Sequence, residues 1–231
     1  MESVNKKSSK YYKDQLIDKK FVSKEIGVNK NPEDLYNKLK FQYDLTKILD
    51  KYPDRTECPT CSLKMKFYCT SCSKHILKHN EIPNVNLPMD IYIVKHLKEK
   101  REKSSAYPCI FLSDNFKLSE QPGKFAWSDI KELKITEQGH NYVLYPHKDA
   151  RLIKDLPKEE LKSIKSIKIV DCTWAQANSM MKKIPENVNF LKLEDYQTTF
   201  WRYQWHDDKC LVTVEAIYYL LKEFDEVYSK L

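Results

Sequence analysis

The sequence predicts an α/β protein with a mostly parallel sheet and flanking helices, preceded by a small cysteine-rich module. From Met89 onward, short apolar stretches alternate with helical patterns, as in folds built on parallel strands. The clearest strand is Ile167 to Val170, which is β-branched and apolar and is followed by a helical pattern from Trp174 to Lys183. Two Cys-x-x-Cys pairs precede this region.

Composition limits the possible functions. The 231 residues suit one medium domain with a small appendage, and the net charge of +7 favours an acidic partner, either nucleic acid or another anionic surface. With only 3 glycines, the chain lacks a Gly-rich dinucleotide loop. We expect a soluble intracellular protein, since the sequence has no signal peptide and no run of about 18 apolar residues.

Residues 1–54 are predicted to form a basic and helical N-terminal extension. Residues 1–30 are rich in lysine and weakly patterned, so they form either a solvated tail or a segment that contacts RNA phosphates. Asn31 and Pro32 are typical of a helix start, and an apolar stripe continues from there to Tyr52.

Residues 55–82 are predicted to form a small zinc-binding module. Its candidate ligands are the four thiols of Cys58, Cys61, Cys69 and Cys72. Soft sulfur ligands in two closely spaced pairs favour a closed, tetrahedral, structural zinc site. A redox dithiol is the alternative for either pair taken alone.

Residues 83–231 are predicted to form the main domain, which begins with a linker that contains Pro83 and Pro88. Besides 167–170, the expected strands are 89–94, 109–112, 142–145 and 190–193. Further helices are expected at 156–165, with lysines on one face, and at 214–228, where Thr213 would cap an amphipathic helix.

The segment Asp171-Cys172-Thr173-Trp174 would lie where the 167–170 strand ends and the next helix begins. Ligands bind at the carboxyl ends of strands in open α/β sheets, so Asp171 would face the crevice. Thr173 would cap the helix, and an ordinary capped turn is the alternative interpretation. Cys172 is a conceivable nucleophile, although a small packing thiol is the expected role.

Three separated motifs resemble the signature of the DTW-domain family, the tRNA-uridine aminocarboxypropyltransferases. They are Asp-x-Thr-Trp at 171–174, Phe-Trp-Arg at 200–202 and Thr-x-Glu-Ala at 213–216. The resemblance covers roughly residues 55–228. It extends to a His-x-x-Glu segment followed by Lys-Ser, at 96–104, in which Leu97 replaces the family's proline; the family's serine before Thr213 is Val212 here.

The resemblance implies a SPOUT-like fold, with the chain knotted near the cofactor. It implies transfer of the 3-amino-3-carboxypropyl group of S-adenosylmethionine to N3 of a tRNA uridine, in the D-loop, by a monomer without membrane contact. The nucleus is the expected location, with the cytoplasm as the alternative. A non-catalytic zinc-bearing RNA-binding module and an S-adenosylmethionine-dependent RNA methyltransferase remain the other possible functions.

The resemblance also implies site residues. Asp171 is the first candidate for the general base, and Glu215 is the second, or binds the donor's ammonium. Arg202 would bind the donor carboxylate or a tRNA phosphate, and Trp174 would stack on the target base or anchor the turn. With Thr173 these form the predicted catalytic set. The predicted donor-binding residues are His96, Glu99, Lys103, Ser104, Tyr145, Pro146, Asp171 and Thr213.

Overall fold

The structure is a computed structural model, and it describes residues 51–52, 54–77, 84–121, 127, 141–182, 184–186, 188–198, 200 and 210–229. One compact unit comprises residues 43–194 and 212–231, and a second comprises 1–42 and 195–211. The predicted basic extension, nearly all of the 31–52 helix and the predicted site residue Arg202 lie outside the described residues.

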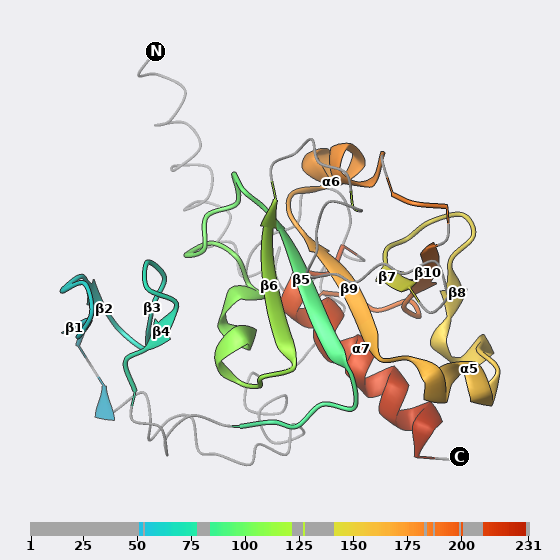
Figure 1. The fold of residues 1–231 in the computed structure, drawn as a ribbon, viewed down its shortest axis with the longest axis horizontal. Coiled ribbons are helices and arrows are strands. Elements are labelled where there is room, and N and C mark those ends of the chain that lie inside the picture. Colours follow the sequence, from blue (N-terminus) through green and yellow to red (C-terminus); the bar gives the residue numbers. More distant parts are fainter. Residues whose placement is uncertain are drawn as a thin grey trace, which may run out of the picture. The chain divides into compact units, whose positions relative to one another are not determined.

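Six parallel strands form the central sheet, which confirms the predicted α/β class (Figure 1). Their order across the sheet is β6-β5-β9-β7-β10-β8. The bounds are β5 Asp90–His96, β6 Phe116–Gln121, β7 Asn141–Leu144, β8 Arg151–Leu152, β9 Ser166–Asp171 and β10 Val188–Lys192.

Both faces of the sheet are buried, as expected for parallel strands. On one face, Ile93 and Ile169 pack in the cluster that also holds Ile217 and Phe224 of helix α7 (Thr213–Tyr228). The other face packs in a second cluster with Met180 of helix α6 (Trp174–Met181). A short helix α5 (Lys158–Ser163) precedes β9.

The strand order places a switch in chain direction between β5 and β9. From β5 the chain continues to β6 on one side, and from β9 it continues to β10 on the other side. Ligands of open α/β sheets bind outside the carboxyl ends of strands at such a point. The carboxyl ends of β5 and β9 are His96 and Asp171.

Several element predictions were wrong. Residues 109–112 were predicted as a strand, but 109–111 belong to the 3-10 helix η2 (Tyr107–Phe111) and Leu112 is its C-cap. Pro108 occupies the first turn of this helix, where the missing N–H has no cost. Strands β6 and β8 were missed, since four of the six residues of β6 are polar and β8 has two residues. The helix predicted at 156–165 spans only α5, after the short 3-10 helix η5 (Ile153–Asp155).

The cysteine-rich segment forms two short antiparallel hairpins. β1 (Thr56–Glu57) pairs with β2 (Lys64–Met65), and β3 (Tyr68–Cys69) pairs with β4 (Lys74–His75). Among the described residues, no helix is long and apolar enough to cross a membrane.

Candidate active site

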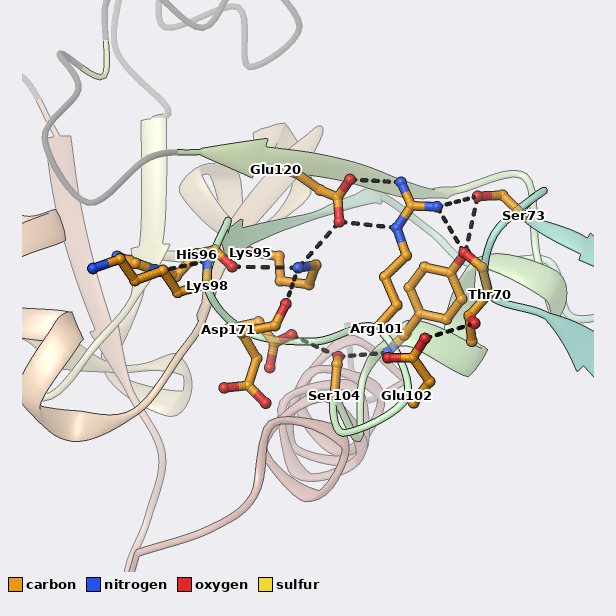
Figure 2. A network of polar contacts seen from close by, with 12 residues as sticks. Thr70, Ser73, Lys95, His96, Lys98, Arg101, Glu102, Ser104, Glu120 and Asp171 are labelled. Carbon is orange, nitrogen blue, oxygen red and sulfur yellow. Dashed lines mark hydrogen bonds and ion pairs between the residues drawn. The ribbon is translucent and has the colours of Figure 1, made fainter. Parts of the chain in front are cut away.

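Asp171 joins three segments that are far apart in the sequence. Its side chain is 4% exposed. Oδ2 accepts a 2.6 Å hydrogen bond from the Ser104 hydroxyl (Figure 2), and Oδ1 accepts a 2.7 Å bond from the Thr213 hydroxyl. The structure therefore brings Asp171, Ser104 and Thr213, which come from three of the predicted motif segments, together at the carboxyl end of β9.

The start of α7 is held by the same region. Val212 is the N-cap and Thr213 is already the first helical residue, so the prediction that Thr213 caps this helix was wrong. Its hydroxyl binds Asp171 instead. The Val214 N–H donates to Ser105 Oγ at 3.2 Å, and the Val212 N–H donates to Glu215 Oε2 at 3.2 Å. Glu215 is half-buried in the first turn of α7.

His96 ends strand β5 as a buried, neutral imidazole. Its Nδ1 accepts a 3.0 Å hydrogen bond from the Lys98 N–H, which leaves the proton on Nε2. Burial, and then the charges of Lys98 and Lys95, lower the pKa of His96. At neutral pH its Nε2–H is therefore a hydrogen-bond donor without a charge.

The other predicted residues differ in exposure. Lys103, Pro146, Thr173 and Trp174 are exposed, and Glu99 and Tyr145 are half-buried. Thr173 is the N-cap of α6, as predicted, and its N–H donates to Gln176 Oε1 at 3.0 Å. The indole of Trp174 is 39% exposed at the first position of α6, so it is accessible for stacking.

Cys172 is poorly suited to act as a nucleophile. Burial, and then the charges of Asp171 and Glu99, raise the pKa of its thiol to about 12. A thiol nucleophile reacts as the thiolate, which is scarce here at neutral pH. This agrees with the expectation that Cys172 is a packing residue.

The four thiols predicted to bind metal lie together. The Sγ atoms of Cys58, Cys61, Cys69 and Cys72 are all within 4.8 Å of one another. A tetrahedral zinc site with Zn–S bonds of about 2.3 Å has sulfurs about 3.8 Å apart. The cluster therefore has the size and ligand chemistry of a zinc–thiolate site.

Each of the two cysteine pairs is followed by a serine with a positive φ angle. The residues directly after Cys61 and Cys72, Ser62 and Ser73, have φ of 59° and 51°. Non-glycine residues seldom adopt positive φ, and they do so where the surroundings impose it.

Backbone N–H groups of Thr60 and Cys61 lower the pKa of Cys58 to about 6, which favours a thiolate.

Sequence reasoning missed a network of charges beside Asp171. Lys95 Nζ lies 3.1 Å from Glu120 Oε1, and Arg101 binds the same carboxylate through Nε at 3.0 Å and Nη2 at 2.6 Å (Figure 2). The detectable signal was Lys95 itself, because it occupies the same strand face as the buried Ile91 and Ile93.

Comparisons with known proteins agree with these motifs. The DTW domain matches residues 55–231. The chain is 26% identical over 206 residues to tRNA-uridine aminocarboxypropyltransferase 1 of Xenopus laevis, covering 74% of this chain and 71% of that protein. It is 28% identical over 214 residues to the protein of the same name from Mus musculus, covering 76% and 70%. No solved structure matches. The chain belongs to the DTW-domain family.

Proposed function

We propose that this chain transfers the 3-amino-3-carboxypropyl group of S-adenosylmethionine to N3 of a uridine in tRNA, in the D-loop. The observation that carries the proposal is the junction at Asp171. There, residues from the 96–104, 171–174 and 213–216 motifs meet at the switch point of a parallel sheet. The names of the relatives, tRNA-uridine aminocarboxypropyltransferase 1, support the same reaction.

The reaction needs positioning and a base. The uridine N3–H is deprotonated, N3 forms a bond to the methionine γ-carbon, and the C–S bond breaks with its electron pair left on sulfur. The products are the modified uridine and neutral 5′-methylthioadenosine. Because the sulfonium leaves readily, the protein's task is to align carbon, nitrogen and sulfur and to accept one proton.

The contacts of the two acids suggest different roles. Asp171 is almost fully buried, and each of its oxygens accepts a hydroxyl hydrogen bond, so we propose that it mainly positions Ser104 and Thr213. Glu215 is more accessible and lies in the same helix turn as Thr213, so we propose it as the base. This reverses the order that the sequence alone favoured.

The remaining polar groups suit the donor's amino-acid part. The Nε2–H of His96 and the ammonium of Lys103 are donors for its carboxylate, and Glu99 is an acceptor for its ammonium. Tyr145 and Pro146 follow β7 and would line the donor site. Trp174 is accessible for stacking on the target base, and Thr173 would orient it.

The domain architecture is part of the proposal. The four cysteines would hold one structural zinc in a module spanning 55–82, ahead of a catalytic domain at 83–231 with a SPOUT-like, knotted chain path. Arg202 would contact the donor carboxylate or a tRNA phosphate. A monomer located in the nucleus is the expected state in the cell.

Mass spectrometry of unmodified tRNA treated with the protein and S-adenosylmethionine tests the function. The expected result is a mass gain of one aminocarboxypropyl group on a D-loop uridine, with release of 5′-methylthioadenosine. A gain of one methyl group would instead identify a methyltransferase. Binding of tRNA with no mass change would identify a non-catalytic RNA-binding protein.

A further inference from the structure

The loop at residues 97–104 is tied to the proposed donor site at both of its ends. At its start, the Lys95 ammonium donates to the carbonyl oxygens of His96, at 3.3 Å, and of Glu99. At its end, the Ser104 hydroxyl donates to Asp171 and accepts from the Tyr107 N–H at 3.0 Å. Both ends of the loop therefore carry residues of the proposed donor site, His96 and Ser104.

Arg101, in the middle of the loop, binds the four-cysteine module. Its Nη1 donates to the Thr70 carbonyl at 2.8 Å and lies 3.2 Å from Ser73 Oγ (Figure 2). Thr70 lies between Cys69 and Cys72, and Ser73 directly follows Cys72. The guanidinium is therefore hydrogen-bonded to the turn that carries Cys69 and Cys72.

The remaining nitrogens of Arg101 point to the sheet. Nε and Nη2 bind both carboxylate oxygens of Glu120 on β6, and Glu120 also pairs with Lys95. A paired, two-point contact of this kind fixes orientation as well as distance, which a lysine at the same place could not do.

A second contact runs parallel to the first. The fully buried Tyr107 shares a 2.9 Å hydrogen bond between its hydroxyl and Ser73 Oγ, and its ring lies 5.6 Å from the Arg101 guanidinium. Thr70 Oγ1 also donates to Glu102 at 3.0 Å. The turn around Cys69 and Cys72 is therefore fastened to the loop at several points.

We propose that Arg101 is a positioning residue through which the four-cysteine module sets the shape of the 97–104 loop. The module then acts on the donor site through the loop. The effect on donor affinity rests on the proposed function; the effect on the loop does not. The competing interpretation is that Arg101 only stabilises the edge of the sheet.

A matched control exists at the opposite edge of the sheet. Arg151 of β8 also makes a two-point contact with a carboxylate, that of Glu160. β8, which carries Arg151, is separated from β5 by three strands in the sheet order, and Glu160 lies on α5. Arg151→Met therefore removes an equivalent ion pair without touching the proposed connection.

The test combines hydrogen–deuterium exchange with donor binding in the zinc-loaded full chain. Arg101→Met is expected to speed exchange of the 97–104 amides and to weaken S-adenosylmethionine binding, each by about tenfold or more, with zinc content unchanged. Arg101→Lys is expected to restore only part of both, and Arg151→Met to change neither. Stripping metal from the wild-type chain is expected to loosen the same amides.

Non-additivity is the decisive readout. If the module acts through Arg101, removing metal from Arg101→Met adds little further exchange in the loop. Equal effects of metal removal in both proteins, or unchanged exchange in Arg101→Met, would overturn the proposal. If no variant binds S-adenosylmethionine but the exchange pattern holds, the proposed function fails and the positioning role stands.

Discussion

Two lysines on neighbouring strands are equally buried and differently partnered. Lys95 of β5 and Lys168 of β9 are each 1% exposed. Lys95 pairs with Glu120 and donates to two backbone carbonyls. Lys168 donates to the Ser166 hydroxyl at 3.0 Å and lies 5.9 Å from the Tyr92 ring centroid, with no carboxylate partner among the described residues.

The difference shows that burial alone does not mark a site. Lys95 is the register partner of Asp171, on the α7 face, and its partners belong to the network around the proposed site. Lys168 lies on the α6 face beside Tyr92 and Val143. Burial without a compensating charge lowers the pKa of Lys168 to about 8. Lys95 binds two carbonyl oxygens of the 97–104 loop region, whereas burial of the Lys168 charge lowers the free energy of unfolding.

The largest expected effect comes from substituting Asp171, the register partner of Lys95. Asp171→Asn keeps the side-chain size but replaces one carboxylate oxygen with an NH₂ group. The NH₂ group only donates, so the hydroxyl of Ser104 or of Thr213 loses the oxygen that now accepts from it. We expect a folded, zinc-containing protein in which donor affinity and single-turnover transfer are both reduced, because Ser104 and Thr213 lose their shared acceptor. Glu215→Gln is the companion variant, and it is expected to lose transfer while keeping donor affinity. Loss of transfer alone in Asp171→Asn would make Asp171 the base.

Removing the partner of the buried Lys95 is the next largest change. Glu120→Gln leaves Lys95 and Arg101 without their shared carboxylate. Because Lys95 is buried but Glu120 is 24% exposed, we expect a loss of about 2–3 kcal/mol, below that of a fully buried pair. Urea unfolding followed by circular dichroism measures the loss. Glu160→Gln, at the more exposed pair with Arg151, is expected to cost less. Equal losses would show that the environment of Lys95 is not special.

Lys168→Met is expected to act in the opposite direction. Methionine has a similar length and no charge, so it removes the desolvation cost while filling the same space. We expect a gain of about 1–3 kcal/mol in the free energy of unfolding. Lys95→Met, by contrast, is expected to destabilise, because it strips Glu120 and two carbonyls of a partner. A destabilised Lys168→Met would mean that this ammonium has a stabilising role.

The smallest expected effect is a dependence of stability on pH that arises from Lys168. Because the pKa of Lys168 is lowered to about 8, the folded chain releases this proton before the unfolded chain does. Stability from this group therefore rises as pH increases from about 8 to 10 and is constant below that window. The difference between wild type and Lys168→Met, measured by urea unfolding from pH 7 to 9.5, is expected to shrink by about 2 kcal/mol. A constant difference would contradict a lowered pKa.

The sequence predicted the strands that are apolar and the motifs that are local. Residues 167–170 and 142–145 were found because strands buried on both faces are continuous apolar runs. β6 was missed because Lys117 and Glu120 interrupt its pattern, and Glu120 owes its place to Arg101 and Lys95, which are distant in sequence.

The site was predicted as a set of residues but not as an arrangement. The motifs identified Ser104, Asp171 and Thr213, yet no sequence pattern could show that both oxygens of Asp171 accept hydroxyl bonds. That observation changes its proposed role from base to positioning residue. Arg101 carried no signal, because a lone arginine in a charged turn resembles any solvated residue.

The strand order also determines which strands can pair while the chain is being synthesised. Strand β5 can pair with β6 soon after it is made, since Ile91 aligns with Phe116. Its other neighbour is β9, where Ile91 aligns with Ile167, so that side of β5 must wait for a much later segment. Contacts between distant segments form slowly, and an unpaired apolar strand is prone to aggregate in the interval. A nascent chain that stalls before Ser166 would therefore leave one side of the apolar strand β5 unpaired in the middle of its own sheet.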